Sequence, residues 1–84
     1  MTILEHLIEQ LKTLKGADPK SRIDCNIDKR AERFEITHLG NSIKVDYFVN
    51  FEKTKEQSFK FKDNVKATAI KVLDYFGVKR DKAV

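Results

Sequence analysis

The sequence is short of the residues that cross-link, bend or anchor a chain. Among its 84 residues it has one cysteine, one proline, three glycines and no tryptophan. A single cysteine forms no internal disulfide, so Cys25 is interpreted as a small buried apolar residue of a protein from a reducing compartment. No apolar run approaches the roughly 20 residues of a membrane span, and the N-terminus lacks the pattern of a signal peptide. The sequence therefore predicts a cytoplasmic protein with no membrane partner.

Side chains for catalysis and metal binding are also scarce. Three dispersed glycines exclude a glycine-rich phosphate-binding loop. His6, His38 and Cys25 are the only soft metal ligands, and no two of them have the spacing that brings ligands together on a helix. A buried Cys25 with no electropositive neighbour in the sequence is an inert thiol. We therefore predict no catalytic, cofactor-binding or metal-binding residues, and a protein that is not an enzyme.

The composition that remains is that of one folded domain. The chain is 40% apolar with six phenylalanines, and its charged residues, 36% of the total, are mixed in sign. This length suits one domain with a modest core. We predict a single domain over residues 1–78, followed at 79–84 by a basic tail that frays.

The start of the chain predicts an amphipathic helix over Ile3–Leu14. Its apolar residues recur at helical spacing and form one stripe: Leu4, Leu7, Ile8, Leu11 and Leu14. Thr2 and Glu5 match a capping box, and Gly16 is placed to end the helix in a left-handed conformation. Because the stripe is strongly apolar, we expect this helix to cover a sheet.

A second helix is predicted over Val65–Phe76. Asp63 or Asn64 can accept hydrogen bonds from its first turn, and Gly77 suits the left-handed conformation that often follows a helix. The residues expected to face the core lie within one narrow arc: Val65, Ala69, Val72, Leu73 and Phe76. The chain therefore carries a helix at each end.

Between the helices, apolar and polar residues alternate as in strands with one buried face. The alternation predicts strands at Ile23–Ile27, Phe34–Ile36, Ile43–Phe51 and Phe59–Phe61, of which the first is the least certain to pair. Gly40 and Asn41 mark a hairpin turn. Asp28–Arg30 is predicted to form another turn, and Lys53–Glu56 a polar loop. The expected fold is α+β, a two-layer α-β-β-β-β-α sandwich in which both helices pack on one face of an antiparallel meander of three to four strands.

Phe48 breaks this alternation, because it falls on the face that both helices leave open. A phenylalanine in water costs solvation free energy unless something covers it. Three interpretations are open from the sequence. A loop or the C-terminal tail folds over the ring, a dimer forms across the open face, or the ring stacks on the bases of single-stranded nucleic acid.

The net charge of +4 is confined to the second half of the chain. Residues 1–42 carry seven Lys/Arg and seven Asp/Glu, whereas residues 43–84 carry ten and six. Such an excess is either a solvated lysine-rich surface or a site for a polyanion. The basic residues expected near Phe48 or at the start of the second helix are Arg22, Arg33, Lys44, Lys60, Lys62 and Lys66. We therefore predict a binding module for RNA or DNA, with a homodimer or another protein partner on the same open face as the alternative.

The spacing of Lys60, Lys62 and Lys66 is also similar to that of lysines in a known protein family. The segment Phe61–Gly77 is loosely similar to the last part of the double-stranded RNA-binding domain family, which places lysines at the start of its last helix. That resemblance implies contact with RNA at this corner. The Gly-Pro-x-His loop of the family is missing, since Asp28–Ala31 stands at the corresponding turn, and the chain is not assigned to the family.

Overall fold

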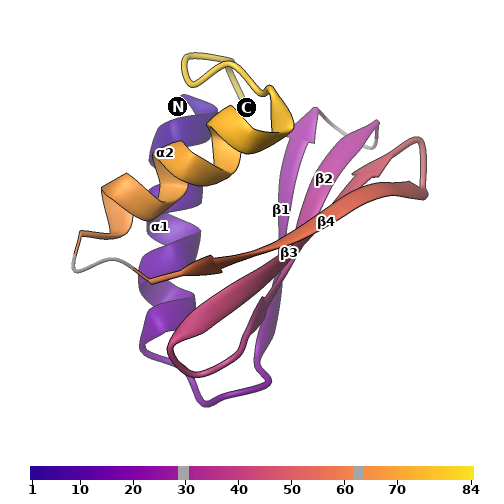
Figure 1. Cartoon of the computed structure of the whole chain (residues 1–84). Coiled ribbons are helices and arrows are strands. Elements are labelled where there is room, and N and C mark those ends of the chain that lie inside the picture. Colours follow the sequence, from indigo (N-terminus) through magenta and orange to yellow (C-terminus); the bar gives the residue numbers. More distant parts are fainter. Residues whose placement is uncertain (29–30, 62–63) are drawn as a thin grey trace.

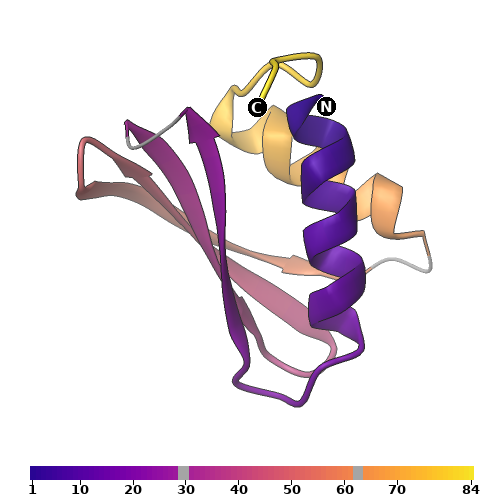
Figure 2. The same cartoon turned by 180° about the vertical axis from the view of Figure 1, so that it is seen from behind.

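The computed structural model describes residues 1–28, 31–61 and 64–84. The elements follow the order α1 (Ile3–Lys15), β1 (Arg22–Asp28), β2 (Glu32–His38), β3 (Ser42–Val49), β4 (Glu52–Lys60) and α2 (Val65–Phe76). The strands form one antiparallel sheet in the order β1-β2-β3-β4. Both helices cover one face of this twisted sheet and leave the other face open (Figure 1, Figure 2). The predicted fold is confirmed, and Ile23–Ile27 belongs to a true fourth strand.

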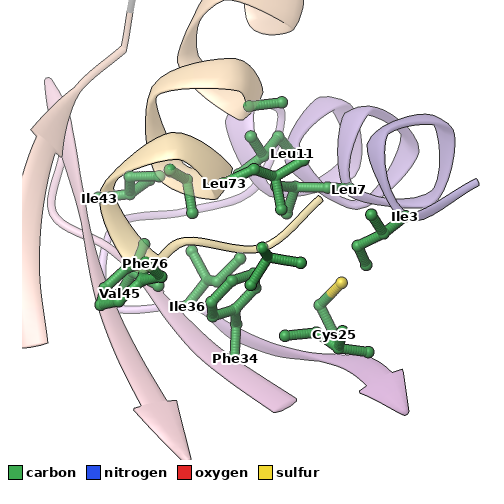
Figure 3. Close-up of a cluster of buried hydrophobic side chains, with 14 of the residues drawn as sticks. Ile3, Leu7, Leu11, Cys25, Phe34, Ile36, Ile43, Val45, Leu73 and Phe76 are labelled. Carbon is green, nitrogen blue, oxygen red and sulfur yellow. The ribbon is translucent and has the colours of Figure 1, made fainter. Parts of the chain in front are cut away.

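The core lies between the helices and the covered face of the sheet (Figure 3). Leu7, Leu11 and Leu14 of the predicted stripe on α1 are buried, and Ile3 joins them. The buried residues of the sheet alternate along β1, β2 and β3: Cys25, Ile27, Phe34, Ile36, Ile43 and Val45. Each fully buried side chain of this kind contributes about 1.5–3 kcal/mol relative to its exposed state. The sheet and α1 therefore pack together through the apolar residues that the sequence pattern predicts to be buried.

The helix ends agree with the sequence at all but one position. The capping box of α1 is present, and the Asn64 side chain accepts from the first turn of α2, while the alternative cap Asp63 lies outside the described residues. Gly77 adopts the predicted left-handed conformation with φ 72°. The left-handed cap predicted at Gly16 is wrong. Its φ is −84°, because its N–H still bonds to the Lys12 carbonyl and continues the helical geometry.

The hairpin of β3 and β4 differs most from the prediction. β3 ends at Val49, and Asn50 and Phe51 form a two-residue turn with φ 51° and 71°. The polar loop predicted at Lys53–Glu56 is wrong, because these residues belong to β4. Phe51, expected to face the helices, is 72% exposed. We call residues 48–55 the arm, because this part of the hairpin extends beyond both helices (Figure 1, Figure 2).

The two ends of the chain run side by side at the top of Figure 1. Thr2 and Ala83 form an isolated β-bridge, and the Ile3 N–H donates to the Lys82 carbonyl at 2.7 Å. Val78 is buried against the core. Residues 79–84, which we expected to fray, are thus attached to the start of α1 by backbone hydrogen bonds.

Candidate functional site

Most of the predicted site residues lie on the open face of the sheet, where they alternate with buried positions. These are Arg22, Arg33, Lys44, Phe48 and Lys60. Acidic residues share the same face, and several pair with the cations. The Glu35 carboxylate lies 2.5 Å from Arg33 Nη1 and 3.4 Å from Arg22 Nη1. Glu56 Oε2 lies 3.0 Å from Lys44 Nζ. The positive charge of the open face is therefore largely balanced by its own carboxylates.

A bulge in β4 adds one more cation to this face. Thr54 is the extra residue between the pairs Tyr47–Lys55 and Phe48–Lys53, and its hydroxyl donates to the Tyr47 carbonyl at 3.2 Å. The bulge turns Lys53 to the open face. Its Nζ lies 3.9 Å from Asp46 Oδ1 and 3.3 Å from Glu56 Oε1, between two carboxylates that stand opposite each other. Lys53 therefore relieves a like-charge pair, and hydrogen bonds from Lys44 and then Lys53 lower the pKa of Glu56.

One face of the Phe48 ring is covered by a side chain of the sheet itself. Arg33 is its cross-strand neighbour, and the guanidinium carbon lies 4.1 Å from the centroid of the ring. Glu35 holds the same guanidinium. The ring is half-buried, and one of its faces already carries a cation–π contact worth about 0.5–1 kcal/mol. This arrangement reduces what Phe48 can offer to a stacking base.

Lys60, at the end of the open face, and Lys66 have different surroundings from Arg22, Arg33 and Lys44. They are exposed, at the end of β4 and in the first turn of α2. Among the described residues, no carboxylate lies within 4.0 Å of either amine. The first turn of α2 has no acidic residue, so the positive end of the helix dipole adds to the charge of Lys66. Lys62, the remaining predicted residue, lies outside the described residues.

Three lysines that the sequence did not single out lie at the same end of the molecule. Lys12 and Lys15 occupy the last turn of α1, and Lys15 Nζ lies 5.9 Å from the ring centroid of Phe61, just past β4. The Lys20 N–H donates to the carbonyl of His38, the last residue of β2, at 2.8 Å. The end of α1, the end of β4 and the start of α2 lie close together in both views (Figure 1, Figure 2). We call this surface the basic end and define it by Lys12, Lys15, Lys20, Lys60 and Lys66.

The sequence predicts Lys60 and Lys66 as binding residues but does not single out the other three lysines of the basic end. Lys12, Lys15 and Lys20 belong to the half whose net charge is zero. The available signal was their clustering around the end of the first helix. Only the topology of the sheet shows that Lys60 and Lys66 join them. For all five amines, no carboxylate of the described segments lies within 4.0 Å.

Cys25 and His38 are the side chains that most resemble catalytic groups, but the surroundings of both indicate a structural role. Burial raises the pKa of the Cys25 thiol to about 12, so the nucleophilic thiolate is rare at neutral pH. His38 is buried, and its Nδ1 accepts from the Gly40 N–H at 3.1 Å. Within residues 1–28, 31–61 and 64–84, no group of three His, Cys, Asp or Glu could hold a metal ion.

A second polar cluster joins the tail to the sheet near the arm. The Tyr47 hydroxyl donates to Glu32 Oε2 at 2.5 Å, and Lys82 Nζ donates to Glu32 Oε1 at 3.1 Å. The hydrogen bond from Tyr47, followed by that from Lys82, lowers the pKa of Glu32. Burial, followed by the interaction with Glu32, raises the pKa of Tyr47 to about 12. Beside them is a surface pocket of about 380 Å³, lined by Glu32, Gly77, Val78, Lys79 and Lys82. The C-terminal segment and β2 form this pocket together.

Comparison with known proteins gave no match. The chain matches no protein-family model, no curated protein and no solved structure. In the part of the chain that the structure describes, neither helix is long and apolar enough to cross a membrane.

Proposed function

We propose that this chain is a small, non-enzymatic nucleic-acid-binding module of the cytoplasm that contacts phosphates through its basic end. The observation that supports the proposal is the placement of charge. The lysines of the basic end are exposed and have no described carboxylate within 4.0 Å, whereas Arg22, Arg33 and Lys44 on the open face are paired. A paired cation must give up its carboxylate before it neutralises a phosphate, whereas a lysine without a carboxylate partner neutralises the phosphate directly and releases the counterion bound there. The basic end, which includes the predicted Lys60 and Lys66, is therefore better suited to a polyanion than the open face around Phe48.

The chemistry of this surface determines the kind of binding to expect. Lysine is a point charge on a flexible stem, so it neutralises phosphates without reading bases. About three or four phosphate contacts give weak, non-specific binding whose log–log salt slope is roughly −2 to −4. We expect similar affinities for RNA and DNA, because no feature of the basic end selects a 2′-hydroxyl.

The test is an anisotropy titration of labelled single- and double-stranded RNA and DNA at several salt concentrations. Lys60→Gln/Lys66→Gln should weaken binding and reduce the magnitude of the salt slope by about two. Lys53→Gln/Lys55→Gln is the matched control, because it removes the same charge at the other end of the same hairpin, and it should leave the slope unchanged. No binding at about 10⁻⁴ M, the weak limit of non-specific contacts, would overturn the proposal. An equal loss in both double variants would overturn it as well.

A single substitution separates the basic end from the open face. Phe48→Ala removes the ring that a base would stack on and leaves all five lysines of the basic end in place. We expect an unchanged affinity. A loss of affinity without a change in salt slope would instead return the binding site to the open face, since stacking contributes about 1–3 kcal/mol per base.

A further inference from the structure

The tip of the arm carries a side chain that the isolated chain leaves in solvent. Phe51 is 72% exposed, and its φ is 71°. Glycine is the favoured residue at the second position of a two-residue turn with positive φ, because a side chain there is strained. The phenylalanine therefore makes both the turn and the surface less favourable. Such a residue is suited to a contact outside its own chain.

The pocket beside the C-terminal segment opens at the same end of the molecule. Glu32, in its lining, pairs across the sheet with Val49, two residues before Phe51. Its volume of about 380 Å³ exceeds the roughly 150 Å³ of an apolar cavity that binds benzene. Gly77 and Val78 are the uncharged residues of its lining, beside Glu32, Lys79 and Lys82. Because Phe51 is largely exposed, it does not fill the pocket of its own chain.

The charges next to the ring and next to the pocket are complementary. Glu52 follows Phe51 and has no cation within 4.0 Å among residues 1–28, 31–61 and 64–84. Lys79, in the lining of the pocket, likewise has no carboxylate partner among these residues. A ring that enters the pocket from another molecule brings its Glu52 toward Lys79. A second copy of this chain therefore supplies both the ring and the matching charge.

We propose that two copies of this chain form a dimer through their arm ends, each placing Phe51 in the pocket of the other. A two-fold axis makes the contact twice, so each dimer contains two rings in pockets and two Glu52–Lys79 pairs. The basic end lies at the opposite end of the hairpin, which keeps the lysines of the two copies apart. The dimer does not depend on the proposed nucleic-acid binding.

Other surfaces of the sheet are less suited to the second copy. The exposed edge of β4 resists strand pairing, because the Ser58 N–H donates to Gln57 Oε1 at 3.0 Å and the Thr54 bulge interrupts the ladder. The open face consists mainly of charged side chains, which are depleted from the centres of interfaces. The arm end combines an exposed ring with a pocket of suitable size.

The oligomeric state of the full chain tests this proposal without any nucleic acid. Sedimentation velocity over about 10⁻⁶ to 10⁻⁴ M should show a concentration-dependent dimer. Phe51→Gly should raise the dimer dissociation constant by at least about 30-fold, as loss of a hot-spot aromatic does, while the glycine suits the turn and preserves the fold. Leu39→Ser is the control, because Leu39 is also an exposed apolar residue but lies in the β2–β3 turn at the opposite end. It should leave the dissociation constant unchanged.

A charge exchange makes the test specific for the pocket. Glu52→Lys should weaken the dimer by repulsion from Lys79, and Glu52→Lys/Lys79→Glu should restore it. A wild-type chain that stays monomeric over the whole concentration range would overturn the proposal. So would a dimer that Phe51→Gly leaves intact, or one that the exchange of both charges fails to restore. Because no nucleic acid is present, these outcomes are independent of the basic end.

Discussion

The two ends of the β3–β4 hairpin belong to one pair of strands but differ in what covers them. On the inner face, Ile43 is buried and Phe59 is half-buried beneath the helices, whereas Gln57 and Lys55 on the same face are exposed. The reason is length. A helix of 12 residues, such as α2, is about 18 Å long, whereas a strand of nine residues, such as β4, spans about 30 Å. A sheet that outgrows its helices leaves an arm whose residues are free of the core.

The two ends also differ in charge. Near the core-covered end, the lysines of the basic end have no carboxylate among the described neighbours. Toward the arm, Lys53 is shared between Asp46 and Glu56, and Lys82 between Glu32 and Asp28. In our two proposals, the hairpin therefore separates the surface that contacts a polyanion from the surface that contacts a second copy.

The largest effect should come from the core. Leu11 is fully buried between the helices and the sheet (Figure 3), so Leu11→Ala should cost about 2–5 kcal/mol in the free energy of unfolding. Leu39→Ala, at an exposed turn, should stay within about 0.5 kcal/mol of the parent. Urea unfolding followed by circular dichroism measures both. An unchanged urea midpoint for Leu11→Ala would show that α1 does not pack on the sheet as described.

At the arm the sign of the effect should reverse. Phe51→Gly should stabilise the monomer by about 0.5–1 kcal/mol, because relief of the strain at positive φ exceeds the added flexibility of the unfolded chain. Asn50→Gly is the control and should change stability less, since asparagine tolerates this conformation. Both are measured by urea unfolding at concentrations where the chain is monomeric. A destabilised Phe51→Gly variant would mean that the ring packs within its own chain.

The same contrast explains how much the sequence could predict. The helices and β1 to β3 were predictable, because burial of one face imposes a period on residues such as Leu7, Phe34 and Val45. The first half of β4 has no buried face and therefore no such period, and the turn at Asn50 and Phe51 lacks the glycine that marks a hairpin. Without the position of this turn the register between β3 and β4 is not predictable, and neither are the ion pairs of Glu56 with Lys44 and Lys53. The meeting of Lys60 and Lys66 with Lys12, Lys15 and Lys20 was not predictable, because contacts between distant segments decide which lysines come together.

A smaller effect on stability is expected for the contact between Arg33 and Phe48, which lie on neighbouring strands of the open face. A double-mutant cycle of Arg33→Ala and Phe48→Ala should give a coupling free energy of about 0.5–1 kcal/mol, the range of an exposed cation–π pair. The same cycle with Lys44→Ala and Phe48→Ala is the control, because Lys44 pairs with Glu56 instead of stacking on the ring. Equal coupling in both cycles would mean that Phe48 responds to the charge of the sheet rather than to the stacked guanidinium.

The smallest effect on stability should appear only at acid pH. It concerns Glu32, Tyr47 and Lys82, the cluster that joins the tail to the sheet beside the arm. The Tyr47 hydroxyl and Lys82 hold the pKa of Glu32 below its ordinary value of 4.5. A group with a lowered pKa adds stability above that ordinary value, and the contribution is lost as the pH falls through the lowered one. Glu32→Gln should therefore flatten the acid limb of a plot of urea midpoint against pH, at pH values below about 4.5, and leave the plot near neutral pH parallel to that of the wild type. At concentrations where the chain is monomeric, Glu52 has no cation within 4.0 Å among the described residues, so Glu52→Gln should leave the acid limb unchanged. Identical acid limbs in wild type and Glu32→Gln would show that the tail and β3 are not coupled through Glu32, and the pocket that depends on their positions would lose one of its supports.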